Sequence, residues 1–131
     1  ERNKVEEMIL VASRSHRDIR LENLINSLQI GEQKSIGSVG CKVCSILKGE
    51  SDFYISLSGA TAPKDWDLAA PEAVITAAGG KFTHADEKPL YYNTGDFSQR
   101  GCLVASNGSQ HIDICKKVFK AISLIDPKFK V

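Results

Sequence analysis

The apolar and polar positions of the first thirty residues predict a strand followed by a helix. Residues 8 to 13 (MILVAS) form a short continuous apolar run, which is typical of a buried strand. Apolar residues then recur between positions 19 and 28 with the spacing of one helical face, and Gly31 predicts the end of that helix. Residues 14 to 18 are expected to form the loop between them, with Ser15 and Asp18 fitting a capping box.

The next segment predicts a second helix and a second strand. Residues 34 to 40 contain too much Gly and Ser for a helix interior, whereas helical spacing of apolar residues begins at Val39 and continues to Gly49. Residues 52 to 57 have strand propensity, and residues 58 to 63 have the composition of a loop.

The clearest element is an alanine-rich helix at residues 68 to 78, with Pro71 in its first turn and Gly79-Gly80 at its end. Further on, the pattern predicts short strands and a final helix that begins near Ser109. The strands are expected at 81 to 84, 90 to 92 and 102 to 105. Together the elements predict an α/β fold in which a mixed β-sheet is sandwiched between helices.

Composition fits this fold and excludes several classes of protein. The 131 residues, 42% hydrophobic and 25% charged, match an ordinary single globular domain. A net charge of +1 gives no field strong enough to indicate nucleic acid or an anionic membrane as a partner. The longest apolar run, from Met8 to Ala12, is far shorter than the roughly 20 residues of a membrane span. No secretory signal opens the chain, so we expect a cytoplasmic protein.

The four cysteines are too few for a disulfide scaffold, so reduced, buried thiols are the default interpretation. Cys41 and Cys44 have the CxxC spacing, but no second CxxC or histidine pair completes a zinc motif. Because the chain begins with Glu1 and its single methionine, Met8, lies inside the first predicted strand, we expect a fragment of a longer protein.

Ser38 and Lys42 are the first candidates for ligand binding. An uncapped helix start at Ser38 would offer backbone N–H groups to a phosphate, and Lys42 lies one turn later, where its side chain leans back toward that end. The alternative from the residues alone is a capping serine and a solvated lysine.

Asp67 and His16 have the same two interpretations. Asp67 would cap the alanine-rich helix or act as an oxygen ligand for Mg²⁺, which proteins often hold through one or two carboxylates plus phosphate and water. His16 follows the first strand between cationic neighbours and could bind phosphate or a base, but an isolated histidine is more often a surface or core residue.

Residues 66 to 80 carry a resemblance to a known enzyme family. The run Trp66-Asp67-Leu68-Ala69-Ala70-Pro71-Glu72-Ala73-Val74, continuing to Ala78-Gly79-Gly80, resembles the C-terminal signature of the inositol monophosphatase superfamily, the Mg²⁺-dependent, lithium-sensitive phosphatases. Gly37-Ser38 before a helix, and an Asp-x-Tyr strand at 52 to 54, agree with the order of segments in that family. The resemblance covers nearly the whole chain and implies the C-terminal, substrate-side domain of such an enzyme.

Within the superfamily, residues 13 to 16 and 39 to 43 resemble the 3′(2′),5′-bisphosphate nucleotidase branch. The resemblance implies that Asp67 is a Mg²⁺ ligand, and that the substrate is bound by a set of other side chains. These are His16, Ser38, Val39, Lys42 and Ser56. Ser56 stands where the inositol enzymes have Glu and some nucleotidases have Arg, so it argues against an inositol-specific pocket.

The chain also departs from the family pattern. His84 and Glu87 replace the usual Asp and Gly of a peripheral hairpin. More important, residues 1 to 131 contain no paired-Glu metal site and no Asp-Pro-x-Asp-Gly-Thr motif, which the family uses for its other metal ions and the attacking water. We therefore expect the missing N-terminal half to be required for turnover, this chain alone to be inactive, and the exposed face to favour a homo-oligomer.

Three functions remain open at this stage. The first is a phosphatase that converts adenosine 3′,5′-bisphosphate to AMP and phosphate. The second is an inositol monophosphatase or another sugar-phosphate phosphatase, and the third is a non-catalytic phosphate-binding module.

Overall fold

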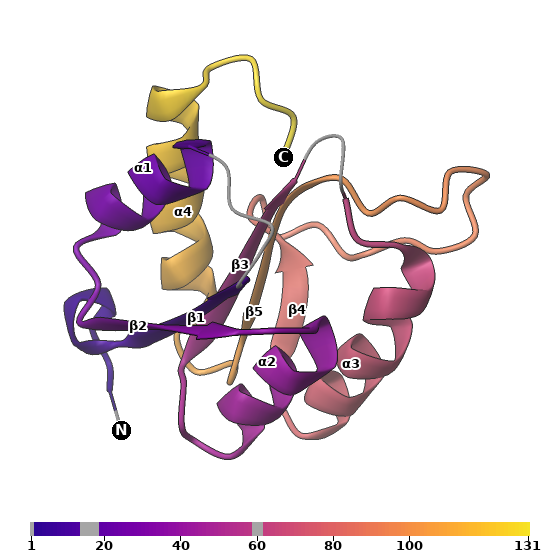
Figure 1. Cartoon of the computed structure of the whole chain (residues 1–131), viewed down its shortest axis with the longest axis horizontal. Helices are drawn as coiled ribbons and strands as arrows, with labels where there is room; N and C mark the ends of the chain where they lie inside the picture. Colours follow the sequence, from indigo (N-terminus) through magenta and orange to yellow (C-terminus); the bar gives the residue numbers. More distant parts are fainter. Residues whose placement is uncertain (1, 14–18, 59–61) are drawn as a thin grey trace.

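The computed structural model describes residues 2–13, 19–58 and 62–131, and these form a five-stranded sheet with helices on both faces (Figure 1). In chain order the strands and α-helices are β1 (Ile9–Ser13), α1 (Ile19–Leu28), β2 (Glu32–Ile36), α2 (Val39–Leu47), β3 (Phe53–Ser58), α3 (Asp65–Ala77), β4 (Lys81–His84), β5 (Gly101–Ser106) and α4 (His111–Ile125). A single 3₁₀ turn, Val5–Glu7, precedes β1. The expected α/β fold with a mixed sheet between helices is confirmed.

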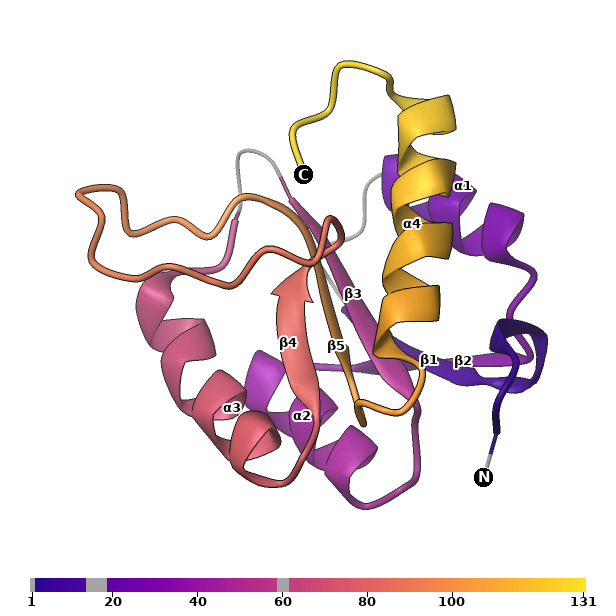
Figure 2. The same ribbon diagram turned by 180° about the vertical axis from the view of Figure 1, so that it is seen from behind.

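The sheet is mixed because the direction of its strands changes in the middle. Its order is β2-β1-β3-β5-β4; β1 is parallel to β2 and to β3, whereas β5 is antiparallel to β3 and to β4. Figure 2 shows α1 and α4 together on one face and α2 and α3 together on the other. The central strand β3 is therefore covered on both faces.

Strand alternation divides the core into two layers, one on each face of the sheet. On β3, Phe53, Ile55 and Leu57 point toward α1 and α4, while Tyr54 points toward α2 and α3. The first layer is closed by the apolar stripes of α1 and α4, whose buried members include Leu24 and Val118. The second layer contains Val43 and Ile46 of α2 with Leu68 and Ile75 of α3.

Two sequence predictions about strands were incomplete or wrong. The polar strand β2 was not predicted, because it lies at the edge of the sheet and carries no apolar alternation; pairing with β1 specifies it. Residues 90 to 92 were predicted as a strand and are not one. The Tyr91 carbonyl accepts a hydrogen bond from the Gln99 side chain (2.7 Å), and the Asn93 N–H donates to Asp65 (2.8 Å), so side chains replace a neighbouring strand as partners.

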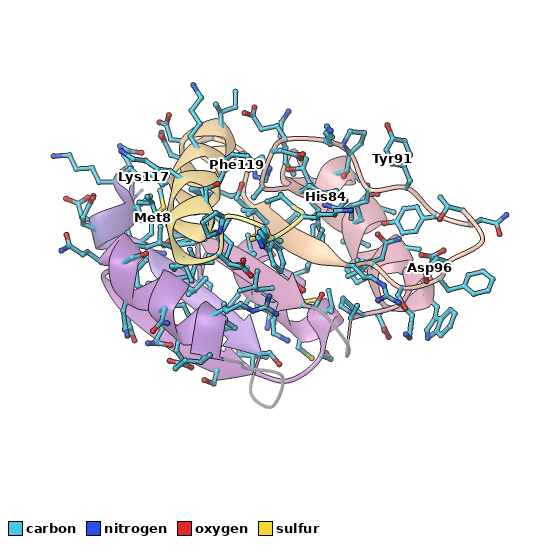
Figure 3. The ribbon with its side chains drawn as sticks, turned by 90° about the horizontal axis from the view of Figure 1, so that it is seen from above. Met8, His84, Tyr91, Asp96, Lys117 and Phe119 are labelled. Carbon is cyan, nitrogen blue, oxygen red and sulfur yellow. The ribbon has the colours of Figure 1, made fainter. Side chains whose placement is uncertain are left out.

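The alanine-rich helix begins at Asp65, three residues earlier than predicted, so Pro71 lies inside it and not in the first turn. The segment that follows β4 projects beside the start of this helix. The Asp65 N–H donates to the Phe97 carbonyl (2.8 Å) and the Gln99 N–H to the Pro63 carbonyl (2.7 Å). Figure 3 shows Tyr91 and Asp96 on this projecting segment, at the opposite end of the molecule from Met8 and Lys117.

The described residues also bear on membrane spans and on the cysteines. No helix within these residues combines the length and the apolar character needed to span a bilayer. Cys102 and Cys115 are buried as expected, but Cys41 and Cys44 are exposed on α2, so the prediction of buried thiols holds for only two of the four cysteines.

Candidate functional site

Three strands end at the same edge of the sheet, and the candidate residues follow them. Because β2 and β3 are each parallel to β1, the carboxyl ends of the three strands lie at one edge of the sheet. The chain passes from β1 to α1 on one face and from β2 to α2 on the other (Figure 1). Open α/β sheets bind their ligands outside the carboxyl ends of strands at the point where such connections diverge.

Ser38 begins α2 directly after β2, and it does not leave the helix end uncapped. Its Oγ accepts a hydrogen bond from the Cys41 N–H at 3.1 Å, and its carbonyl accepts from the Lys42 N–H at 3.3 Å. The expectation of an uncapped helix start is therefore wrong for the Cys41 N–H, whereas the Lys42 N–H makes the first ordinary hydrogen bond of the helix. The N–H groups of Val39 and Gly40 precede them in the first turn and have no partner in the described part of the chain.

The backbone of Ser38 is strained. Its φ of 54° and ψ of 146° lie near a region that only glycine occupies freely. Gly37 and Gly40 flank it, and a Cβ added at either position would meet nothing within 4 Å. The approach to the two N–H groups at the start of α2 is therefore open on the side of the glycines.

Lys42 is buried, contrary to the alternative of a solvated lysine. Its side chain is only 3% exposed, and its Nζ donates to the Ser38 carbonyl at 3.2 Å. The Nζ also lies 5.2 Å from the centre of the Tyr54 ring. Burial lowers the pKa of the Lys42 ammonium, partly opposed by Cys41. Among the described residues no carboxylate pairs with it, so a buried cation faces the site with two N–H donors to spare.

Tyr54 and Ser56 lie on one face of β3, two residues apart, and both are buried. Burial raises the pKa of the Tyr54 phenol; hydrogen bonding by Ser56 opposes this rise and the negative charge of Asp67 adds to it. Phe82 of β4 meets the ring edge to face, with ring centres 6.1 Å apart. The phenol therefore lies within electrostatic reach of the candidate residues of β3 and of α3.

Asp67 is exposed in the first turn of α3, and its carboxylate has a capping role. Its Oδ2 accepts the Lys64 N–H at 2.9 Å, while its own N–H donates to the Lys64 carbonyl at 2.9 Å. Pro71 has no N–H to donate to the Asp67 carbonyl one turn earlier, so that oxygen also lacks its helical hydrogen bond.

Among the described residues, Asp67 fits one ligand position of a divalent-metal site. Asp67 offers one carboxylate oxygen not engaged by Lys64, which suits the hard oxygen ligands that Mg²⁺ prefers. Nearby Asp65 is occupied, because its two oxygens accept from Gln99 and from the Asn93 N–H. In the ranges that the structure describes, no three His, Cys, Asp or Glu side chains gather as a metal site. Asp67 therefore fits the role of one ligand among several, the others supplied from outside these residues.

The structure thus brings three of the six predicted residues together at the start of α2: Ser38, Val39 and Lys42. Ser56 lies on the same face of β3 as Tyr54, whose ring lies beside Lys42. Asp67 is linked to the same phenol by its charge. His16 lies outside the described residues. Sequence reasoning missed Tyr54 as a member of the site, although its place two residues before Ser56 in a strand with period-two alternation puts both on one face.

Comparisons with known proteins show the family and the fold of the chain. The inositol monophosphatase family matches residues 2–123. The rat 3′(2′),5′-bisphosphate nucleotidase 1 is 29% identical over 85 residues, covering 65% of this chain and 27% of the relative. Inositol monophosphatase 3 of Xenopus laevis is 31% identical over 124 residues, covering 87% of this chain and 33% of the relative.

Among solved structures, the Thermotoga maritima IMPase superimposes with a TM-score of 0.73 at 21% identity. It covers 95% of this chain, and this chain covers 45% of it. The chain thus spans less than half of that structure and about a third or less of the two curated relatives.

Proposed function

Because the chain belongs to the inositol monophosphatase family, we propose that it is the substrate-side, C-terminal half of a Mg²⁺-dependent phosphatase for 3′(2′),5′-bisphosphate nucleotides. The reaction would convert adenosine 3′,5′-bisphosphate to AMP and phosphate. The observation that carries this proposal is Lys42, a buried ammonium without a carboxylate partner among the described residues.

A bisphosphate nucleotide carries a second phosphate that is not hydrolysed and must still be bound. The start of α2 offers what such a dianion needs: the N–H groups of Val39 and Gly40, the positive end of the helix dipole, and the Lys42 ammonium. A solvated anion gains little from one lysine, but an ammonium already removed from water interacts more strongly. We assign this cluster to the phosphate that stays on the product.

Mg²⁺, when bound, would lower the pKa of a water molecule and stabilise the departing ester oxygen. Asp67 is the residue of this chain that would contribute to holding it, through the oxygen not engaged by Lys64. Lys42, Val39 and Gly40 would fix the nucleotide so that its scissile phosphate lies toward Asp67. Because the remaining metal ligands are not among the described residues, we propose that the 131-residue chain binds substrate without turning it over.

A second candidate substrate is an inositol monophosphate. The resemblance to the Xenopus laevis inositol monophosphatase 3 spans more of this chain than that to the rat nucleotidase, which favours this alternative. Ser56 argues against it, because a short neutral hydroxyl beside Tyr54 makes a weaker contact with sugar hydroxyls than a carboxylate would.

Calorimetric titration of the 131-residue chain separates these possibilities. With Mg²⁺ present, we expect adenosine 3′,5′-bisphosphate to bind at least tenfold more tightly than AMP or inositol 1-phosphate. Lys42→Met should remove that preference, and Lys48→Met, at an exposed lysine at the C-terminal end of the same helix, is the control. Tighter binding of inositol 1-phosphate would assign the chain to the sister activity.

Phosphate release should then be compared between the 131-residue chain and the longest reading frame that contains it. Release by the longer protein, dependent on Mg²⁺ and lost in Asp67→Asn, supports the proposal. Turnover by the short chain would contradict the division of the metal site between two halves. Binding without turnover by either protein would favour a phosphate-binding module.

A further inference from the structure

The Lys42 ammonium has an unusual environment for a buried cation. A buried charge is normally paired with an opposite charge, because removal from water costs several kcal/mol. The polar contact of Lys42 is instead the neutral Ser38 carbonyl at 3.2 Å, and the Nζ also lies over the Tyr54 ring, 5.2 Å from its centre. This distance lies within the range of about 6 Å in which an ammonium is attracted by an aromatic face.

The Tyr54 ring is held by the sheet and not by α2. Tyr54 lies in the central strand β3, opposite Val11 of β1 and Ala105 of β5. The ring is 4% exposed, and Phe82 packs edge to face against it. Because the sheet holds this residue, its ring offers a fixed surface beneath the lysine ammonium.

An aromatic face affects the lysine differently from a carboxylate. A carboxylate would neutralise the ammonium locally, occupy its N–H donors and repel an incoming anion. The ring attracts the cation through its quadrupole but accepts no conventional hydrogen bond, so the charge and the two spare N–H groups stay available to a phosphate oxygen. The structure therefore orients a cation without neutralising it.

We propose that Tyr54 is a positioning residue of the phosphate site: its ring face holds the Lys42 ammonium over the first turn of α2 and so sets the affinity for a phosphate dianion. This inference rests on the proposed function only in that a phosphate ester binds at α2. It does not depend on which ester is the substrate.

The test pairs Tyr54→Phe, which keeps the ring, with Tyr54→Leu, which removes it. We expect Tyr54→Phe to bind adenosine 3′,5′-bisphosphate within about twofold of the original chain, and Tyr54→Leu to bind it about tenfold more weakly, the loss expected for one cation–π contact. Inorganic phosphate, titrated alongside, should show the same order. Equal affinities of Tyr54→Leu and the original chain would overturn the proposal.

A double-mutant cycle separates positioning from general damage to the core. In a Lys42→Met background, Tyr54→Leu should cause no further loss of affinity, because the group that it positions is gone. An equal loss in both backgrounds would mean that Tyr54 acts only by supporting the fold, and would refute the inference.

A spectroscopic measurement covers the case in which Tyr54→Leu does not fold. In the original chain the Lys42 ε-methylene protons should resonate upfield of the other lysines because they lie over the ring, and Tyr54→Phe should retain this shift. An ordinary Lys42 resonance would contradict the proposal without any destabilising variant. The chain could bind adenosine 3′,5′-bisphosphate no more tightly than AMP while the Tyr54 variants still changed the affinity for inorganic phosphate. That result would overturn the proposed substrate and leave the role of Tyr54 standing.

Discussion

The two faces of the sheet each bury a basic side chain, and the two side chains differ in their hydrogen-bond partners. On the face covered by α1 and α4, both ring nitrogens of His111 have partners: Nδ1 lies 2.7 Å from Ser106 Oγ, and Nε2 lies 2.8 Å from Thr83 Oγ1. On the face covered by α2 and α3, Lys42 has one carbonyl partner and an aromatic ring. Both side chains are at most 3% exposed.

The number of hydrogen-bond partners distinguishes a buried polar group that completes the core from one that fits a ligand site. Burial lowers the pKa of His111 to about 4, with Lys81 contributing, so the imidazole is neutral at pH 7 and its hydrogen bonds complete a closed core. A lysine with unused donors costs stability, and proteins keep such a cost where a ligand later satisfies the group. The polar group of the α1/α4 face thus completes the core, whereas that of the α2/α3 face supports the proposed binding site.

The largest expected effect tests the structural half of this comparison. Leu24 is fully buried between α1, α4 and the sheet, so Leu24→Ala should lower the free energy of unfolding by about 2–5 kcal/mol through lost burial and a cavity. Urea denaturation measures the change. Trp66→Ala, at an exposed position on α3 where the ring contacts Phe97, is the comparison and should cost about 1 kcal/mol or less. Similar losses at the two positions would remove the distinction between the faces.

The pH dependence of stability tests His111. Because the folded-state pKa of about 4 lies below the ordinary 6.5, the unfolded chain holds a proton that the folded chain lacks between these values. The free energy of unfolding therefore has its full value with respect to His111 above about pH 6.5. It falls by up to about 3 kcal/mol as the pH falls toward 4. His111→Gln should flatten this part of the profile, measured by urea denaturation between pH 4 and 7.5. An unchanged slope in the variant would show that other groups cause the acid sensitivity.

The fold was largely predictable from the sequence where apolar spacing is strong, and less so elsewhere. The stripe of α1 and the run of β1 gave their positions almost residue by residue, because burial on one face dictates which residue types are allowed. The strand β2 was not predictable from its own residues, since EQKSI acquires its conformation from pairing with β1. The segment at 90 to 92 has strand-like residues, but Asp65 and Gln99 take its hydrogen bonds.

Within the candidate site, the sequence predicted the positions of two residues better than their surroundings. Ser38 and Lys42 do lie one turn apart at a helix start, as spacing requires. Neither the positive φ of Ser38 nor the burial of Lys42 could be predicted, and the second depends on the packing of α2 against β3 and its Tyr54 ring. A contact between a helix and a strand that is distant in sequence leaves no periodic pattern.

Replacement of the buried cation tests the binding half of the comparison. Lys42→Met keeps the apolar stem and removes the unpaired charge, so the free energy of unfolding should rise by about 1 kcal/mol at pH 7 while phosphate binding weakens about tenfold. Burial lowers the pKa of Lys42, so the cost of the charge is full below the folded-state pKa and disappears as the pH rises through it toward the ordinary 10.5. The advantage of the variant should therefore shrink at high pH, which denaturation at pH 7 and above will measure. A less stable Lys42→Met would mean that the ring contact outweighs the burial cost.

The smallest expected effect separates two roles of Ser38. Ser38→Gly loses the Oγ cap of the Cys41 N–H, which lowers the free energy of unfolding by a few tenths of a kcal/mol. It also relieves the backbone strain at this position, which destabilises the original chain by about 1–3 kcal/mol. Part of this relief is offset by the greater freedom of glycine in the unfolded chain, so we expect a net gain of about 0.5 kcal/mol. Ser38→Ala keeps the strain and loses the cap, so it should be about 1 kcal/mol less stable than the original chain. Opposite signs in thermal denaturation would show that the strain at the start of α2 is real and is maintained beside the binding groups, whereas two losses of equal size would reduce Ser38 to an ordinary cap.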